Sequence, residues 1–117
     1  MKKIEEIRSI LYSKEFEEFF ESLDKKTQSK LEDNVSILKT VYVLSTKFVK
    51  RIVNTDLYEL RVSVGYNEYR SILFAIDHEN VIQATKIILL NGFLKKSSKD
   101  YDKQIKKATN ILKNIEL

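Results

Sequence analysis

The chain has no cysteine and no proline, only two glycines, Gly65 and Gly92, and a single histidine, His78. The absence of cysteine excludes disulfides, thiolate zinc sites, iron–sulfur clusters and cysteine nucleophiles. One histidine cannot form a multi-histidine metal site, and two glycines cannot supply a P-loop or a GxGxxG dinucleotide turn. The sequence therefore predicts no metal site and no cofactor.

The rest of the composition is typical of one globular domain. The 117 residues are 43% hydrophobic and 32% charged, and no repeat, low-complexity tract or Gly/Ser/Pro linker interrupts them. We therefore expect a single domain over residues 1–117. No apolar stretch reaches membrane-spanning length, and Glu5 and Glu6 precede any apolar run, unlike in a signal peptide. We expect a cytoplasmic protein without a membrane partner.

The charge of +4 is unevenly distributed along the chain. Residues 1–34 carry seven basic and nine acidic side chains, whereas residues 86–117 carry eight basic and three acidic ones. Because a basic segment attracts polyanions, this asymmetry favours a polyanionic partner bound near the C-terminal end.

The first half of the chain has helical periodicity. After an extended segment at 7–12, Ser13 is placed to cap one helix, and Asp24 is placed to cap a second that ends near residue 44. A loop anchored by Phe48, Val49 and Ile52 then leads to a sheet. The apolar stripes of the helices are Phe16, Phe19, Phe20 and Leu23 in the first and Leu31, Val35, Leu38 and Tyr42 in the second.

From residue 57 the apolar period changes to two, which predicts strands. The three runs are Leu57–Tyr66, Tyr69–Asp77 and Val81–Leu90, separated by turns at 67–68 and 78–80. Residues 100–117 return to helical spacing, with lysines opposite the apolar stripe. The predicted fold is α+β, with an N-terminal strand, a helical hairpin, a three-stranded antiparallel meander and a C-terminal helix.

The predicted register places two arginines on one face of the sheet. In a two-residue turn at 67–68, residues whose numbers sum to 135 stand opposite each other, so Arg61 and Arg70 share a face. A three-residue turn at 78–80 adds Lys86 to that face, beside Ile72. Arg70 then has no acid next to it, whereas Arg61 lies two residues from Glu59 and could simply belong to an ion pair.

A lysine-rich segment with aromatic residues follows the last predicted strand. Cations neutralise the charge that develops on a phosphate during phosphodiester cleavage, and the ribose 2′-OH is a nucleophile that needs no metal. The segment therefore favours RNA as the substrate. We expect RNA contacts from Lys86 on the preceding strand and from Phe93 and Lys99 in this segment. Alternatively, its lysines form only a solvated loop and Tyr101 anchors the last helix.

Four motifs occur in order between residues 48 and 112. They are Leu57-Tyr58-Glu59-Leu60-Arg61, then Tyr69-Arg70-Ser71-Ile72-Leu73-Phe74, then Asn91-Gly92-Phe93-Leu94-Lys95-Lys96-Ser97-Ser98-Lys99, then Ile105 with Ala108. As a set they resemble the phage-derived HigB-like branch of the RelE/ParE toxin superfamily. The resemblance implies the RelE-like fold of microbial RNase toxins.

The resemblance also implies a function, that of the toxin of a type II toxin–antitoxin pair. Such a toxin is typically a ribosome-dependent mRNA endonuclease, or mRNA interferase, which inhibits translation by promoting attack of a 2′-OH on the adjacent phosphate. By position in the motifs, Arg70 matches the strand arginine that stabilises the phosphate. The resemblance implies that Arg61, Lys95 and Lys96 are catalytic residues as well. Tyr101 lies near the place of an acid/base tyrosine in some relatives.

Two departures from the family pattern concern proton transfer. Asp100-Tyr101 stands where relatives often have threonine and proline, and Asn91 replaces a common histidine. The implied partners are mRNA on the ribosome and a cognate antitoxin, often one with a helix-turn-helix domain. Two alternatives remain open: a non-catalytic, ParE-like inhibitor of DNA gyrase and a degenerate binding protein.

Overall fold

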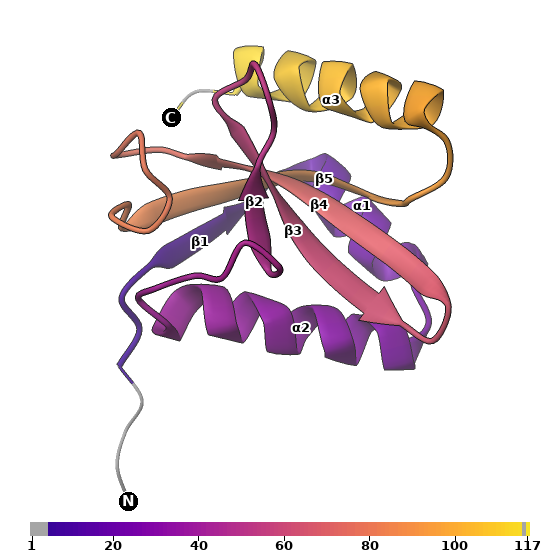
Figure 1. Ribbon diagram of the computed structural model, residues 1–117, viewed down its shortest axis with the longest axis horizontal. Helices are drawn as coiled ribbons and strands as arrows, with labels where there is room; N and C mark the ends of the chain where they lie inside the picture. The colour runs from indigo at the N-terminus through magenta and orange to yellow at the C-terminus, as the bar shows by residue number, and fades with distance from the viewer. Residues whose placement is uncertain (1–4, 116) are drawn as a thin grey trace, which may run out of the picture.

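A five-stranded β-sheet separates two helical layers (Figure 1). The computed structural model describes residues 5–115 and 117, so most of the segment 1–6 and Glu116 of the predicted last helix lie outside the described residues. None of the described helices is long and apolar enough to cross a bilayer. The elements are β1 (Ser9–Tyr12), α1 (Lys14–Ser22), α2 (Lys25–Thr40), β2 (Val49–Arg51), β3 (Leu57–Val64), β4 (Asn67–Ala75), β5 (Lys86–Leu94) and α3 (Ser98–Lys113).

The two faces of the sheet carry separate cores. The strand order is β1-β5-β4-β3-β2, with β1 parallel to β5 and the other neighbours antiparallel. Because side chains alternate along a strand, one set, including Leu60, packs against α1 and α2, and the other, including Ile72, packs against α3. The predicted α+β class and the predicted order of strand, helical hairpin, antiparallel strands and helix are confirmed.

Both predicted helix caps are present. The Ser13 hydroxyl and the Asp24 carboxylate each accept a hydrogen bond from a backbone N–H of the following first turn, at 3.0 and 2.8 Å. They satisfy donors that have no partner within the helix. Gly92 lets α1 approach β5 closely, because a Cβ at this position would lie 2.2 Å from the Phe19 ring.

The segment after α2 differs from the prediction. The helix ends at Thr40 instead of near residue 44, and Tyr42 lies beyond it with 58% of its surface exposed. Where a loop was predicted, β2 pairs antiparallel with β3 and adds a strand to the predicted meander. Three residues, two of them exposed, are too few to show a period-two pattern. Asn54, with a φ of 63°, lies in the turn between β2 and β3.

The turn between β3 and β4 lies at Gly65 and Tyr66, not at residues 67–68. Gly65 has a φ of 60°, the conformation that a two-residue hairpin turn requires and that glycine adopts without strain. The prediction placed Arg61 opposite Phe74, whereas the structure places it opposite Arg70. The pairing partner of Arg61 is therefore shifted by four residues along β4. Because four is an even number, the side chains stay on the predicted faces, and the prediction that both arginines share a face is confirmed.

The last strand begins five residues later than predicted, at Lys86 instead of Val81. The Asp77 carboxylate accepts hydrogen bonds from the backbone N–H groups of Thr85 and Lys86, which closes a longer connection than the three-residue turn predicted. Ile72 therefore stands opposite Asn91, and the prediction that Lys86 lies beside Ile72 is wrong.

A buried arginine joins the ends of several elements. The Arg8 side chain, which is 2% exposed, donates to five backbone carbonyl oxygens at 2.6–3.2 Å. Burial lowers the pKa of this guanidinium, because the charged form loses its hydration. Three of the acceptors belong to the C-terminal end of α2 and the two residues after it, where carbonyls lack helical partners and favour a positive charge. The acceptors are the carbonyls of Leu38, Val41, Tyr42, Val81 and Ile82.

We expect Arg8→Met to lower the free energy of unfolding by about 3 kcal/mol or more, because it leaves several buried carbonyls without donors. Arg8→Lys, which keeps the charge but cannot reach all five acceptors, should lose less. Denaturant unfolding of the three proteins measures both differences. A loss below about 1 kcal/mol for Arg8→Met would contradict this role for the guanidinium.

Candidate functional site

A buried carboxylate organises the face of the sheet that α3 covers in part. Glu59 lies on β3 with 5% of its surface exposed. Arg61 Nε and Nη2 each lie 3.0 Å from Glu59 Oε1, and the Tyr101 hydroxyl donates to Oε2. Arg70 Nε, on the neighbouring strand, lies 3.8 Å from Oε2. Glu59, Arg61, Arg70 and Tyr101 form the cluster called here the Glu59 cluster.

The two arginines of this cluster differ in their exposure to solvent. The Arg61 side chain is 31% exposed, whereas Arg70 as a whole is 5% exposed. Arg70 Nη1 also lies 3.6 Å from a carboxylate oxygen of Glu68 and donates to the carbonyl of Tyr69. The prediction that Arg70 has no adjacent acid is therefore wrong. The actual register brings Glu59 next to it, and Glu68, two residues earlier on β4, shares its face.

Tyr101 connects the cluster to α3. Its ring packs edge-on against the buried Phe93 ring, with centroids 5.9 Å apart. Burial raises the pKa of Tyr101 above its ordinary value of 10.0, and the hydrogen bond to Glu59 raises it further. The phenol therefore stays protonated at neutral pH and donates its hydrogen bond to Glu59.

The connection from β5 to α3 places two lysines beside the cluster. The backbone N–H of Lys95 donates to the Glu68 carbonyl at 2.7 Å, which ties this segment to β4. Ser97 caps α3 by accepting a hydrogen bond from the Asp100 N–H at 3.2 Å. The N-terminus of α3, with its partial positive charge, therefore lies close to Lys95 and Lys96.

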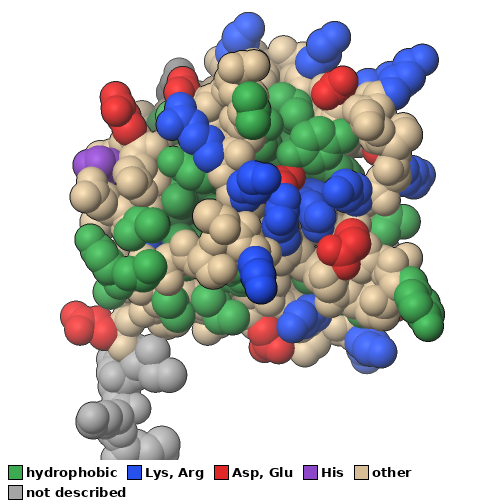
Figure 2. All heavy atoms as spheres, in the orientation of Figure 1, with side chains coloured by type: hydrophobic (Ala, Val, Ile, Leu, Met, Phe, Trp, Pro, Cys, Tyr) green, Lys and Arg blue, Asp and Glu red, His purple; other side chains and the backbone are tan. Residues whose placement is uncertain are grey.

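These groups surround an open pocket of about 290 Å³, called here the β3–α3 pocket. Its lining comprises Glu59, Arg61, Lys95, Lys96, Ser97, Ser98 and Tyr101. Lys and Arg side chains gather over the strands in the middle of the face shown in Figure 2. Three cationic side chains, a helix N-terminus and a hydroxyl donor around one carboxylate are suited to holding a phosphate beside a proton acceptor.

The predicted site residues fall into three groups. Arg61, Lys95, Lys96 and Tyr101 meet in the β3–α3 pocket, and Arg70 lies next to it but is buried. Phe93 belongs to the core beneath Tyr101, and Lys99 is exposed on the first turn of α3 outside the pocket lining. Lys86 lies at the other end of β5, seven residues from Phe93 and therefore roughly 23 Å away along the strand.

Sequence reasoning missed two parts of this site. It treated Glu59 only as a possible ion-pair partner, although Glu59 and Arg61 at positions i and i+2 share a strand face. It also did not use the N-terminus of α3. The hydroxyl of Ser97 three residues before Asp100 was the available capping signal. Among the described residues, no group of three or more His, Cys, Asp or Glu side chains is placed to hold a metal ion.

Comparisons with known proteins agree with this fold. A family model described as "Phage derived protein Gp49-like (DUF891)" matches residues 18–113. The chain is also similar to the free-state structure of an E. coli RelE toxin mutant in which two arginines are replaced by alanine. The TM-score is 0.61 at 11% identity, over 86% of this chain and 97% of that chain. No curated protein sequence matches the chain significantly.

We expect the stability advantage of the wild type over Tyr101→Phe to shrink as pH rises above about 10. The unfolded phenol ionises near 10.0, whereas the folded one, with its raised pKa, stays protonated to higher pH, so the stability that it contributes below pH 10 is lost. Denaturant unfolding of both proteins between about pH 8 and pH 11 tests this. A pH-independent difference would show that the folded phenol titrates normally.

Proposed function

This chain belongs to the Gp49-like family of phage-derived proteins, within the RelE/ParE toxin superfamily, and we propose that it is the toxin of a type II toxin–antitoxin pair. Its activity in this proposal is ribosome-dependent cleavage of mRNA. The observation that carries the proposal is the convergence of Arg61, Lys95, Lys96 and Tyr101 over the buried Glu59 carboxylate.

The cations of the pocket serve the phosphate in this proposal. When a 2′-OH attacks the adjacent phosphorus, negative charge grows on the phosphate oxygens, and preorganised donors stabilise that charge more than they stabilise the ground state. Lys95 and Lys96 are exposed and Arg61 is partly exposed, so these three can reach a bound phosphate. The N-terminus of α3 adds a partial positive charge from the helix dipole.

Glu59 and Tyr101 transfer the protons in this proposal. Glu59 accepts the proton of the attacking 2′-OH, the 2′ oxygen bonds to phosphorus, and the bond from phosphorus to the 5′ oxygen breaks. Tyr101 then donates its proton to the departing 5′ oxygen, which leaves a cyclic phosphate and a 5′-hydroxyl. Because Tyr101 is hydrogen bonded to Glu59 Oε2, the proton taken by Glu59 can return to Tyr101 and restore both groups.

Arg70 is a positioning residue in this mechanism. It lies on β4 between Glu59 and Glu68, and from there it pairs with the catalytic carboxylate on the neighbouring strand β3. Arg70→Ala would remove one of the three groups that pair with the buried Glu59 carboxylate and would therefore lower stability. Loss of toxicity in that variant is therefore expected, but it does not separate catalysis from folding.

Replacing both exposed lysines tests the phosphate site directly. We expect Lys95→Ala/Lys96→Ala to reduce the rate of mRNA cleavage on translating ribosomes by roughly a hundredfold or more. The variant lacks the two positive charges that stabilise the developing phosphate dianion. Lys25→Ala/Lys26→Ala, at the start of α2, changes the net charge equally and should cleave normally. Primer extension on the programmed mRNA measures cleavage, and thermal unfolding confirms that both variants fold.

Expression of the wild-type chain in growing cells distinguishes the proposal from gyrase inhibition. If expression of the wild-type chain stops DNA replication while translation continues and mRNA stays intact, the nuclease proposal is wrong. Equal cleavage by the two double variants would leave the toxin function standing and reject the β3–α3 pocket as its site.

Glu59→Gln tests the proton acceptor. The amide keeps the size of the side chain and can accept the Tyr101 hydrogen bond, but it cannot take a proton from a 2′-OH. We expect cleavage to fall by roughly 10²–10⁴-fold, the usual contribution of a general base, while ribosome binding is retained. Cosedimentation with ribosomes provides the binding control. Cleavage within about threefold of the wild type would assign Glu59 a structural role only.

The partners and location follow from the toxin assignment. We propose mRNA on the ribosome as the substrate, a cognate antitoxin with a helix-turn-helix domain as the protein partner, and the cytoplasm as the site of action. The adjacent reading frame is the place to find the antitoxin.

A further inference from the structure

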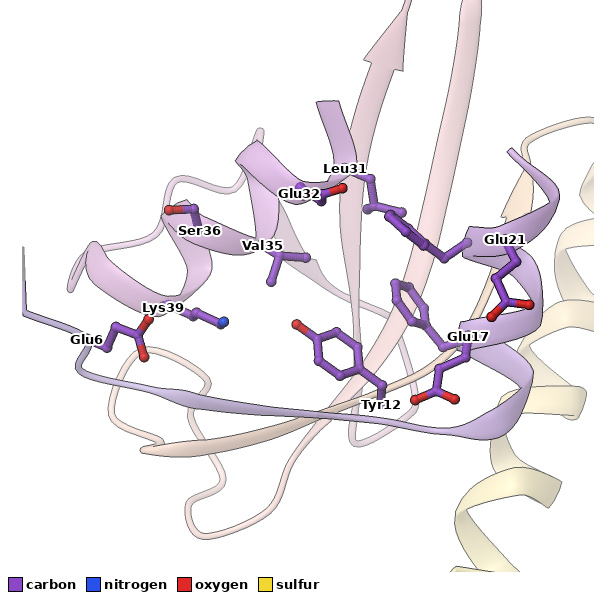
Figure 3. Close-up of a pocket in the computed structure, with 11 residues that line it drawn as sticks. Glu6, Tyr12, Glu17, Glu21, Leu31, Glu32, Val35, Ser36 and Lys39 are labelled. Atoms are coloured by element: carbon purple, nitrogen blue, oxygen red, sulfur yellow. The ribbon is translucent and has the colours of Figure 1, made fainter. Parts of the chain in front are cut away.

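A second pocket lies on the other face of the sheet. It has a volume of about 420 Å³ and is walled by α1, α2 and the end of the edge strand β1 (Figure 3). We call it the α1–α2 groove. Its lining comprises Glu6, Tyr12, Phe16, Glu17, Phe20, Glu21, Leu31, Glu32, Val35, Ser36 and Lys39.

The inner surface of the α1–α2 groove is apolar and aromatic. Phe16, Leu31 and Val35 are buried core residues whose side chains reach the pocket. Tyr12 is 40% exposed, and its ring stacks on Phe16 with centroids 5.5 Å apart. Its hydroxyl extends toward the space between the two helices (Figure 3). Such a surface gains stability when an apolar side chain covers it.

The rim of the groove is acidic, in contrast to the chain as a whole. Among the residues that the structure describes, Glu6, Glu17, Glu21 and Glu32 surround it with Lys39 as the one cation of its lining, although the protein carries a net charge of +4. Burial raises the pKa of Tyr12, and the charges of Glu6 and Glu32 raise it further, as expected in a negative local potential. The rim therefore attracts positive charge to an apolar surface.

We propose that the α1–α2 groove docks a basic amphipathic segment of a partner protein, with an apolar side chain in the groove and lysines or arginines facing the glutamates. Helical segments that bind grooves present anchors of this kind, and complementary charge sets their orientation. A small polyamine would match the rim but would leave Phe16 and Val35 uncovered.

A second copy of this chain is a poorer match for the groove. The lysines of α3 offer the right charge, but the apolar stripe of that helix, including Ala108 and Ile111, is already buried against the sheet. An external segment therefore has to supply both the anchor and the charge. Because the groove and the β3–α3 pocket lie on opposite faces, a partner docked here leaves the pocket open. This inference does not depend on the nuclease proposal.

The test uses a synthetic peptide with leucines at helical spacing and arginines on either side of them. We expect it to bind the wild-type chain with an affinity that falls as salt rises, and Glu21→Lys/Glu32→Lys to weaken binding by about tenfold or more. Glu18→Lys/Asp33→Lys changes the same charges at exposed positions of the same two helices that do not line the groove, and should bind normally. Calorimetry measures the affinities.

Two further measurements separate the alternatives. A peptide with serine in place of leucine should bind at least about tenfold more weakly, because the apolar contact is lost. The proposal is overturned if the peptide does not bind, if both double variants bind it equally, or if the serine peptide or spermidine binds as tightly. Sedimentation showing that the wild type self-associates and that Glu21→Lys/Glu32→Lys is monomeric would assign the groove to a second copy instead.

Discussion

The candidate site depends on one interaction, the pairing of the buried Glu59 carboxylate with groups from three different elements. Arg61 reaches it along β3, Arg70 across from β4 and Tyr101 from the first turn of α3. A carboxylate this far from solvent is tolerated only when donors surround it, so the same contacts that satisfy Glu59 also hold α3 in place over the sheet. In this protein, the same contacts therefore stabilise the fold around the site and position the side chains of the site.

This arrangement gives the two arginines different tasks. Arg70 is enclosed by Glu59 and Glu68, so its charge is used within the protein, whereas Arg61 and the exposed lysines keep charge available at the surface. The two faces of the sheet also differ in charge. The face under α3 carries the cationic pocket, and the face under α1 and α2 carries an apolar groove with an acidic rim. A sheet with helices on both faces can thus present two surfaces of opposite charge to two partners.

Several features of the fold could be read from local sequence because local physics produces them. Ser13 and Asp24 cap helices through hydrogen bonds to their own first turns, and the apolar stripes that follow have the helical period. The period of two from Leu57 onward defined β3 and β4. The prediction that Arg61 and Arg70 share a face held although the turn was misplaced, because the pairing register changed by an even number of residues. β2 left no such pattern, since it is only three residues long and is defined by its pairing with β3.

The sequence by itself determined the secondary structure of most of the chain and the basic character of its C-terminal end, since these follow from periodicity and residue type. Its motifs also named Arg61, Lys95, Lys96 and Tyr101, which line the β3–α3 pocket. Only the tertiary structure decided that Arg70 is buried, that Phe93 belongs to the core, that Lys86 is remote and that Glu59 is central. The reason is physical. Burial and ion pairing depend on which strands are neighbours and on their register, and a turn or bulge that shifts the register by a few residues changes every long-range contact while leaving each local pattern intact.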